Sequence, residues 1–347
     1  MRTELATAAA AQSGVFTRAQ ARTAGYRGPE IRQLTSPGGE WIVLRRGAFA
    51  EREYWESLDP YREQPLALAR AVHLSLEVEH VMSHDSAAHA WGLPLVLPAH
   101  RLIHVTRPGV GGSRTEHGVK HHLARPPEGL FVASGLPVTS VARTALDLAR
   151  EHGRLSGLAA CDKALRLGAT PADFEAVITS MWSWRHVTRV REAARAADPG
   201  AETPGETLTR DLVVQLGAGL PITQFPVEVS HGTAWCDLIL GCHVIEFDGR
   251  RKYRPTDQGG DARGDPAEVI WKEKVRERDV TSHGLGISRV FWDDAMPSAR
   301  QRTLARLHTE YDATCRRFGT VLPPGVDAYA RKMWAARAER LRRDRLM

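Results

Sequence analysis

Residues 233–248 constrain the fold more than any other stretch, because they predict a β-hairpin whose two strands carry carboxylates. The segment reads TAWCDLILGCHVIEFD and offers a two-residue turn at Gly241-Cys242. This register places Asp237 directly opposite Glu246 on one face of the hairpin. Like charges in opposed positions destabilise a sheet. The segment therefore predicts a compensating cation, a raised carboxyl pKa or a different register, and a divalent metal ion is the sharpest of these options.

The same register divides the hairpin into two faces, because side chains alternate along a strand. One face carries the acidic residues, and the other is mostly apolar and suits a core. The first face holds Trp235, Asp237, Ile239, Val244, Glu246 and Asp248, and the second holds Cys236, Leu238, Leu240, His243, Ile245 and Phe247. A core on the second face argues against a metal site built from its cysteine and histidine.

The length and composition are those of a multidomain globular protein. The chain has 347 residues, 42% of them hydrophobic and 25% charged, which allows two or three domains with real cores. It has no apolar run of 18 or more residues, so we expect no transmembrane helix and no membrane partner. The four cysteines form no CxxC pair, and the N-terminus lacks the pattern of a secretory signal. We therefore expect a cytoplasmic protein.

Positive charge is concentrated at the two ends of the chain. The formal net charge is +6, with seven arginines against three glutamates in residues 1–50 and twelve Lys/Arg against five Asp/Glu in residues 296–347. Basic ends around an acidic middle indicate contacts with a polyanion, most simply nucleic acid. Solvated arginine-rich faces are the alternative.

Residues 1–52 predict three short helices followed by a small hairpin, which is the order of a winged helix-turn-helix. In that geometry the third helix enters the major groove of DNA and the hairpin approaches phosphate. The expected DNA-binding residues are Arg27, Arg32 and Gln33 on the third helix, and Arg45 and Arg46 on the hairpin. A small helical domain used for protein contacts is the alternative.

A family resemblance supports this interpretation of the N-terminus. The stretch GVFTRAQARTAGYRGPEIRQLTSPGGEWIVLRRGAFA resembles the N-terminal winged-helix domain of AbiEi-type antitoxins. Those proteins are similar to transcriptional repressors that bind their own promoters in type IV toxin–antitoxin systems. Residues 53–198 resemble the central part of the same family, for which no chemistry is implied. The resemblance implies DNA as a partner, together with a cognate toxin or a second copy of the chain.

The middle region, residues 53–198, predicts short strands followed by helices. Its histidines suggest a metal site, but no pair of them lies in a known ligand frame with cysteine or glutamate. These histidines are His80, His84, His89, His104, His117, His121 and His122. The sequence therefore favours a scaffold role for this α/β region over a zinc site.

Residues 199–295 predict the element order α-β-β-β-α-β, and residues 296–347 predict a basic helical tail. The order and the residues placed on it resemble the PD-(D/E)XK nuclease superfamily, in particular very-short-patch-repair-endonuclease-like domains. The resemblance rests on Glu206, Asp237, Ile245-Glu246-Phe247-Asp248-Gly249 and Lys272-Glu273-Lys274-Val275-Arg276. The family's lysine two positions after the glutamate is missing, since Asp248 stands there, and Lys252 follows four residues later.

This resemblance implies a metal-dependent phosphodiesterase site. Asp237 and Glu246 are expected to hold Mg²⁺ (or Mn²⁺), with Asp248 as a further ligand, while Lys252 and Glu206 complete the catalytic group. Lys272, Lys274 and Arg276 are expected to follow a DNA backbone. Each residue also has a plain explanation: Glu206 fits a helix cap, Lys252 and the later helix fit solvated surface, and a one-residue turn shift removes the acidic pairing.

Together these features predict an α+β multidomain protein with an N-terminal winged helix-turn-helix and a restriction-endonuclease-like C-terminal domain. The leading functional hypothesis is a DNA-binding protein with a Mg²⁺-dependent DNA endonuclease domain, acting in phage defence or DNA repair. The alternative is an AbiEi-type antitoxin or transcriptional autorepressor whose nuclease fold is catalytically inactive.

Overall fold

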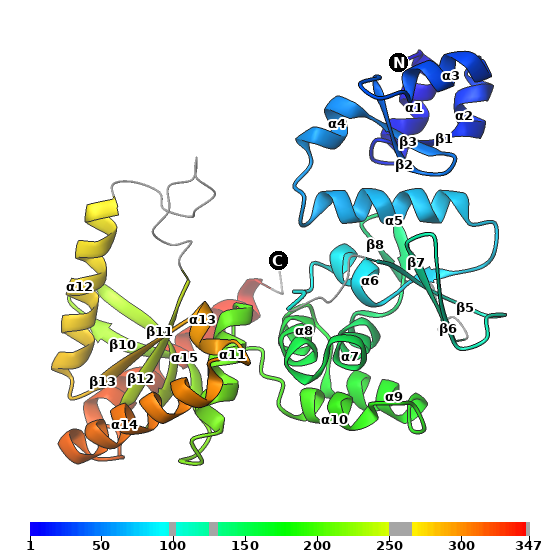
Figure 1. The fold of residues 1–347 in the computed structure, drawn as a ribbon. Coiled ribbons are helices and arrows are strands. Elements are labelled where there is room, and N and C mark those ends of the chain that lie inside the picture. The colour runs from blue at the N-terminus through cyan, green and yellow to red at the C-terminus, as the bar shows by residue number, and fades with distance from the viewer. Residues whose placement is uncertain (97–101, 125–130, 250–265, 345–347) are drawn as a thin grey trace. The chain divides into compact units, whose positions relative to one another are not determined.

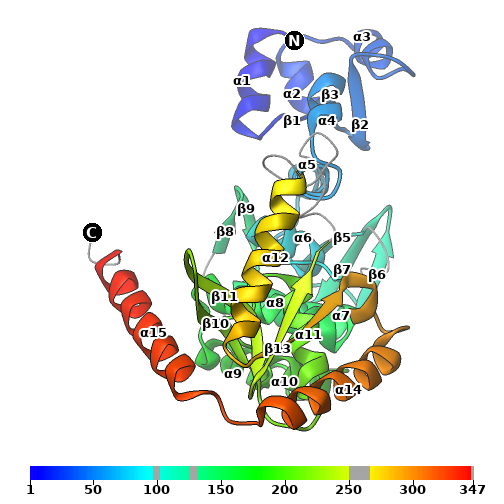
Figure 2. The ribbon, with the colours of Figure 1, turned by 90° about the vertical axis from the view of Figure 1, so that its left-hand side faces the viewer.

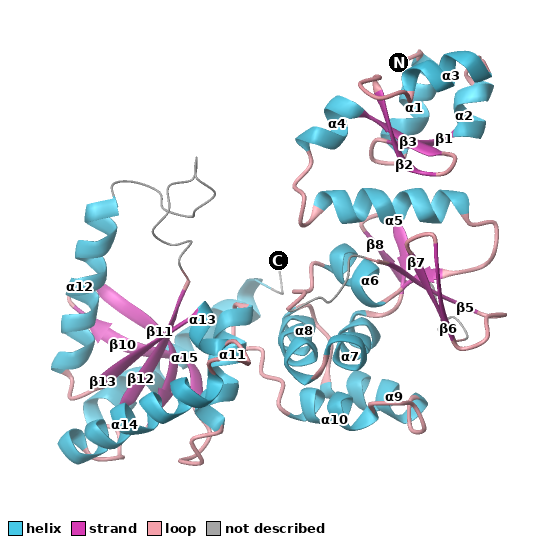
Figure 3. Ribbon diagram, in the orientation of Figure 1, coloured by secondary structure: helices cyan, strands magenta, loops and turns pink. Residues whose placement is uncertain are grey.

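The computed structural model describes residues 1–96, 102–124, 131–249 and 266–344. The chain divides into two compact units, Met1–Ala197 and Asp198–Met347. Both units combine helices with β-sheets, and the whole chain contains three separate sheets among its described residues (Figures 1 and 3). An α+β multidomain architecture is therefore confirmed at this level.

The first unit begins with three short helices and a three-stranded antiparallel sheet. The elements are α1 (Thr3–Ala11), β1 (Val15–Thr17), α2 (Arg18–Thr23), α3 (Gly28–Leu34), β2 (Trp41–Arg45) and β3 (Ala48–Glu51), with the sheet order β1-β3-β2. Thr17 and Gln20 form a reciprocal capping box that starts α2. Phe16, Trp41 and Phe49 pack as a buried aromatic core beneath the helices. The predicted order of three helices and a hairpin is present.

Helix α5 (Glu63–Ser75) follows the short helix α4 (Arg52–Ser57), and neither is predicted from the sequence. Ala67 and Ala71 of α5 pack against Val15 and Ala48 of the N-terminal sheet in one buried cluster. Another side of α5 joins a second cluster with residues of the next sheet. Small residues on α5 permit this close approach, and they also give the sequence a weak amphipathic pattern.

The second sheet of this unit is mixed and has the strand order β6-β7-β5-β4-β9-β8. Helix α6 (His84–Trp91) lies between its first two strands in the sequence and contacts the sheet. The strands are β4 (Val81–Met82), β5 (Ile103–Arg107), β6 (Ser113–Glu116), β7 (Val119–Leu123), β8 (Phe131–Ala133) and β9 (Leu136–Val138). The sequence predicts β5, β7 and β8 correctly, but it misses β4, β6 and β9, which have two to four residues each.

Four helices complete the first unit. They are α7 (Val141–His152), α8 (Arg154–Arg166), α9 (Pro171–Ser180) and α10 (Val187–Arg195). Leu146, Leu158 and Met181 form the centre of their buried core. Helices α7 and α8 approach so closely at Gly157 that an added Cβ would lie 2.2 Å from the Cβ of Ala149.

The second unit is built around a four-stranded sheet in the order β10-β11-β12-β13. Strands β10, β11 and β12 are antiparallel neighbours, whereas β12 and β13 run parallel. The sequential elements are α11 (Pro204–Val214), β10 (Ile222–Val229), β11 (Gly232–Leu240), β12 (His243–Asp248), α12 (Pro266–Ser282) and β13 (Gly286–Phe291). The predicted α-β-β-β-α-β order is therefore present.

Helices cover both faces of this sheet. Helix α12, in front of the strands in Figure 2, and α15 (Pro324–Asp344) share one core cluster with the sheet, to which they contribute Val280, Val326 and Ala330. Helix α14 (Arg300–Phe318) contacts β12 and β13, and α11 contacts β11 and β12. A short helix, α13 (Trp292–Ala295), precedes α14.

The two-face pattern predicted for the hairpin is wrong, because both faces are buried and the alternation breaks at Asp237. The predicted turn at Gly241-Cys242 is present, and pairing continues from Leu240–His243 to Leu238–Ile245. Beyond that pair, the backbone N–H of Phe247 donates to Oδ2 of Asp237 (2.8 Å). The Asp237 side chain thus takes the place of a main-chain acceptor between β11 and β12. Cys236 shares a core cluster with Ile239 and Val244, although alternation places Cys236 on the other face from these two residues.

None of the helices in the described part of the chain is both long enough and apolar enough to cross a membrane.

Candidate functional site

The first candidate surface is a group of exposed arginines on and beside α3. Arg27 and Arg32, with Gln33, are exposed as predicted, and so is Arg46 in the turn between β2 and β3. Two further arginines that are not among the predicted DNA-binding residues, Arg18 and Arg22 of α2, are also exposed. Among the described residues, the ion pairs of this region involve the terminal amine, Arg2 and Arg52, and none of the five exposed arginines. Their positive charge is therefore uncompensated within the described structure.

Hydrogen bonding ties the β2–β3 turn to the start of α2. The backbone N–H of Arg18 donates to the carbonyl oxygen of Gly47 (2.8 Å). Gly47 has a φ of +84°, a left-handed conformation that suits glycine in this tight turn. The turn arginine Arg46 is thereby held beside the first residue of α2, so the two elements contribute to one basic surface.

Arg45 differs from the other predicted DNA-binding residues because it is half-buried. Its Nη1 atom is enclosed by the protein. Burial lowers the pKa of His121 in β7, and the positive charges of Arg107 and, to a lesser extent, Arg45 lower it further. Arg45 thus lies close to the middle sheet, where its guanidinium acts on a buried histidine of the same unit.

Glu206 occupies the first turn of α11, where it acts as a cap. Its backbone N–H donates to Oγ1 of Thr203 (3.2 Å), and its carboxylate accepts from Thr203 Oγ1 (2.9 Å) and from the backbone N–H of Glu202 (2.7 Å). Burial raises the pKa of this carboxyl, and the nearby negative charge of Asp237 raises it further. The helix therefore positions Glu206 close to the hairpin, and the capping role that its sequence pattern predicts is present.

Glu246 is buried and bound to an arginine. Nη2 of Arg276 in α12 donates to Oε1 of Glu246 (2.9 Å) and to the backbone oxygen of Trp235 (3.0 Å). Arg276 was expected on the DNA surface, but its guanidinium is turned toward the sheet. Burial raises the pKa of the neighbouring Cys236 thiol, and the charge of Glu246 raises it further.

Asp248 is also buried and pairs with an arginine of the adjacent parallel strand. Nη1 of Arg289 lies 3.3 Å from Oδ2 of Asp248, and Nη2 of the same arginine contacts Glu273 (3.3 Å) and Glu277 (2.8 Å) of α12. Arg289 therefore links the end of β12 to α12. Arg276 and Arg289 thus place positive charge beside the carboxylates that the sequence predicts as metal ligands.

Glu206, Asp237, Glu246 and Asp248 are oxygen donors of the kind that Mg²⁺ prefers. In this arrangement, however, the carboxylates of Glu246 and Asp248 are bound to Arg276 and Arg289, and Asp237 accepts from a backbone N–H. The negative charge is compensated by protein cations rather than presented to one shared point. The arrangement shown therefore does not fit a bound Mg²⁺ without release of an arginine.

The remaining predicted site residues divide into two groups. Lys272 and Lys274 of α12 are exposed, and their predicted contact with DNA stays a prediction. Lys252 lies outside the described residues.

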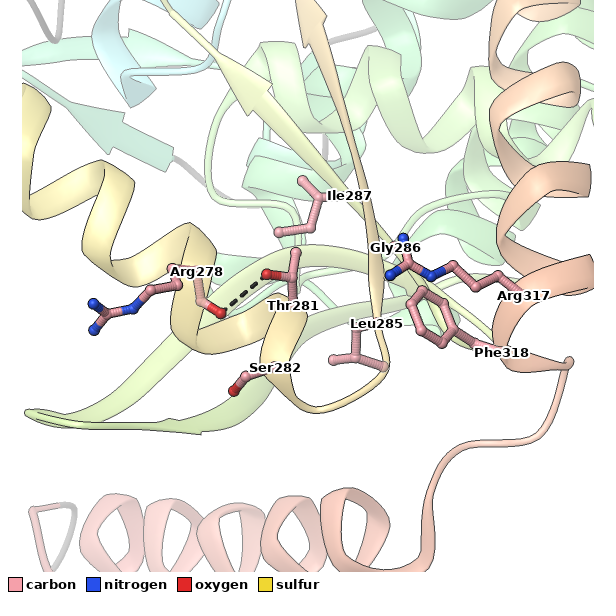
Figure 4. A pocket seen from close by; sticks show the side chains of 8 residues that line it. All are labelled: Arg278, Thr281, Ser282, Leu285, Gly286, Ile287, Arg317 and Phe318. Atoms are coloured by element: carbon pink, nitrogen blue, oxygen red, sulfur yellow. Dashed lines mark hydrogen bonds between the residues drawn. The ribbon is translucent and has the colours of Figure 1, made fainter.

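The second unit has a cavity of about 540 Å³ (Figure 4). It is formed by the C-terminal end of α12, the start of β13 and the end of α14, including Arg278, Thr281 and Phe318. Thr281 Oγ1 donates to the backbone oxygen of Arg278 (3.0 Å) in its wall. Among the predicted catalytic and metal-binding residues that the structure describes, none lines this cavity.

The structure also brings together three histidines of the middle region, for which the sequence favours a scaffold role. His84 of α6, His104 of β5 and His122 of β7 place their ligand atoms within 4.8 Å of one another. The parallel register of β5 and β7 pairs His104 with Lys120 and Thr106 with His122. The recurrence of polar residues at every second position of both strands is the signal that indicates a shared polar face.

Residues 81–194 match the family described as the AbiEi antitoxin C-terminal domain. Two uncharacterized proteins of Mycobacterium tuberculosis, MT2308 and Rv2248, are each 30% identical over 141 residues, which covers 36% of this chain and 52% of each relative. The chain thus spans about half the length of the curated relatives it matches. The resemblance predicted for the middle region is confirmed over residues 81–194, the segment that matches this family.

Proposed function

We propose that this chain is a DNA-binding transcriptional regulator of the antitoxin type. The observation that carries the proposal is the basic surface defined by Arg18, Arg22, Arg27, Arg32 and Arg46, whose charges have no carboxylate partner among the described residues. The AbiEi antitoxin C-terminal domain at residues 81–194 supports the antitoxin part of the function.

The positions of these side chains suit the two kinds of contact that DNA recognition needs. Arg32 and Gln33 are exposed neighbours on α3, and arginine and glutamine form paired hydrogen bonds with guanine and adenine in the major groove. Arg18 and Arg46 lie on α2 and on the adjoining turn, where contacts to phosphate fix the orientation of a recognition helix. We infer that α3 reads bases while α2 and the turn hold the backbone.

A binding assay with the DNA upstream of the chain's own gene tests this proposal. Fluorescence anisotropy at several salt concentrations gives the affinity and the salt slope. Arg46→Gln should weaken binding to all sequences and reduce the slope by about 0.9 for the lost phosphate contact. Arg32→Gln should instead weaken binding mainly to the specific site.

The matched control is Arg114→Gln, which removes an exposed arginine that pairs with Glu116 in β6. This control should bind DNA with the wild-type affinity and slope. Equal loss of binding in Arg114→Gln and Arg46→Gln would refute the assignment of the basic surface.

The antitoxin part has a separate test in cells. If a toxin gene adjoins the gene for this chain, expression of the chain should restore growth to cells that express that toxin. The variant Arg32→Gln separates DNA binding from neutralisation of the toxin. Its loss of DNA binding should appear as loss of repression of a promoter fusion, which is measured independently of growth. Continued growth arrest in the presence of the correctly folded wild-type chain would contradict the antitoxin proposal while leaving DNA binding intact.

We also propose a second candidate function, a Mg²⁺-dependent DNA endonuclease, on one specific observation. Glu206 lies near Asp237, and Asp237 and Glu246 both lie near Arg276, within the element order that resembles PD-(D/E)XK nucleases. The proposal requires Arg276 to release Glu246, because the two are bound at 2.9 Å.

Plasmid nicking with Mg²⁺ or Mn²⁺ tests the second candidate. The wild-type chain should nick the plasmid, and Asp237→Ala and Glu246→Ala should not. Glu273→Gln, which alters a neighbouring ion pair of Arg276 and Arg289, is the matched control and should remain active. Identical nicking by the wild type and all three variants, or by none of them, would refute the endonuclease proposal. The proposal of a DNA-binding regulator would be unaffected.

A further inference from the structure

The AbiEi antitoxin C-terminal domain encloses three imidazoles that come from three different elements. His84 begins α6, His104 lies in β5, and His122 lies in β7. His84 and His104 are only 2% and 1% exposed, whereas His122 is partly exposed. The cluster thus has a buried interior and one side that an ion from solvent can reach.

The nitrogen atoms of these rings have nearly the spacing of ligands around one small ion. Nδ1 of His104 lies 3.1 Å from Nε2 of His122. Zinc–nitrogen bonds of about 2.0–2.1 Å in a tetrahedral site separate two nitrogens by roughly 3.4 Å. The ligand atoms of His84, His104 and His122 all lie within 4.8 Å of one another. The rings of His84 and His122 stack face to face with centroids 3.7 Å apart, so a bound ion requires one of these rings to turn until both lone pairs point at the ion.

The local electrostatics keep the three rings in the neutral form that binds metal ions. Burial lowers the pKa of His84, His104 and His122. The neighbouring imidazoles lower the pKa of His122 further, because each would repel the others' charge. Each neutral ring has one nitrogen with a free lone pair, which is the atom that coordinates a metal.

Carboxylates lie behind two of the rings. Oδ2 of Asp85 is 4.0 Å from Nε2 of His104, on the opposite side of the ring from His122. Oδ1 of Asp147 is 3.9 Å from Nε2 of His84. A carboxylate behind a coordinating histidine orients the ring and increases its basicity.

These carboxylates are themselves fixed by other residues. His152 contacts Oδ1 of Asp85 through Nε2 (2.6 Å), and Arg143 donates from Nε to Oδ2 of Asp147 (2.8 Å). Both aspartates are therefore engaged as supports around the cluster rather than as ligands.

The backbone at His84 is also unusual. Its φ is +48°, in the left-handed region that residues other than glycine rarely adopt. This conformation comes at the start of α6, directly after Ser83, whose Oγ lies 3.1 Å from Nδ1 of His84. Backbone strain of this kind is a feature that functional sites often show. With Asp147 beside Nε2, Nδ1 is the His84 atom that would bind a metal, and it would exchange its contact with Ser83 for the metal.

We propose that His84, His104 and His122 form a binding site for one first-row transition-metal dication, with Zn²⁺ as the ion that fits best. Imidazole ligands suit zinc and its neighbours and do not suit Mg²⁺ or Ca²⁺. Three protein ligands leave a fourth position for water. Bound metal would join α6 to β5 and β7, so the domain would be held together at a point where its core is polar.

Metal binding by the full-length chain tests the proposal. The purified chain is stripped with a chelator, and Co²⁺ is added while its visible absorption is recorded. The expected result is one ion per chain with the intense absorption of a tetrahedral site, displaced by Zn²⁺. Substoichiometric binding, or the weak absorption of six-coordinate Co²⁺, would overturn the proposal.

Two variants and one matched control locate the site. His122→Gln and His104→Gln should each weaken Zn²⁺ binding by about 100-fold or more, beyond the effect of losing a supporting residue. His121→Gln is the control, because His121 is the next residue of β7 and contacts Arg107 instead. Unchanged binding in His122→Gln would refute the assignment.

A measurement on the wild-type chain tests the site even if the variants fail to fold. Cadmium NMR of the Cd²⁺-loaded protein reports the number of nitrogen ligands directly. A shift typical of three nitrogen ligands supports the site, and a shift typical of an all-oxygen site overturns it. The test uses metal binding alone, so failure of the DNA-binding proposal would leave its outcome unaffected.

Discussion

The second unit should lose stability on mild acidification because of one buried histidine, His243. This residue is 2% exposed and lies between two hydroxyl groups. Its Nδ1 atom is 2.7 Å from Oγ1 of Thr314, and its Nε2 atom is 2.8 Å from Oγ of Ser288. Burial lowers the pKa of His243 to about 4, although the charge of Glu310 acts in the opposite direction.

The sign of the effect follows from the protons that each state binds. An unfolded histidine has a pKa of about 6.5, so between about pH 6.5 and pH 4 the unfolded chain holds a proton that the folded chain lacks. The free energy of unfolding therefore rises with pH across this window and falls as the pH is lowered. Between about pH 7.5 and pH 5, the loss due to this group is about 2 kcal/mol.

Urea unfolding of the full chain at several pH values measures this loss. His243→Gln removes the titrating group, so its unfolding free energy should fall by about 2 kcal/mol less than that of the wild type over the same range. His308→Gln serves as the control, since His308 lies on the exposed side of α14 beside Asp312. Parallel pH profiles for the wild type and His243→Gln would refute the reasoning.

Three further substitutions test the packing and charge pairs described above, each by thermal melting of the purified chain. Gly157→Ala should cost about 1–3 kcal/mol, because the new Cβ would lie 2.2 Å from the Cβ of Ala149, and an unchanged melting temperature would contradict that contact. Arg276→Gln should cost about 3 kcal/mol, because it leaves the buried Glu246 without its cation, and adding Glu246→Gln should recover part of the loss. Thr17→Ala should cost about 1 kcal/mol through loss of the capping box at α2, whereas no change would show that the cap contributes nothing.

Local chemistry made much of the second unit predictable. The turn at Gly241-Cys242 and the helix start at Thr203 are both set by residues adjacent in the sequence, and both are present. Hydrophobic runs bounded by glycine and proline likewise gave the order of the strands and helices. Such signals depend on neighbours within a few residues, which the sequence displays directly.

Features that depend on distant residues escaped prediction. The alternation of the hairpin breaks at Asp237 because its carboxylate binds the backbone of Phe247, and helices α12 and α15 cover a face that alternation alone does not mark as buried. His84, His104 and His122 meet only because β5 and β7 run parallel. The alternation of polar residues along β5 and β7 indicates a polar face on each strand, but no spacing among the histidines indicates that the two strands pair.

Helix α5 makes the N-terminal basic surface mechanically dependent on the rest of its unit. Ala67 and Ala71 pack on the sheet beneath α2 and α3, while Ala69 and Val72 pack with the sheet that carries the histidine cluster. Because interiors are close-packed, a displacement of α5 on one side must disturb the packing on the other. The helix that supports the N-terminal basic surface therefore also packs against the sheet of the segment that matches the AbiEi family.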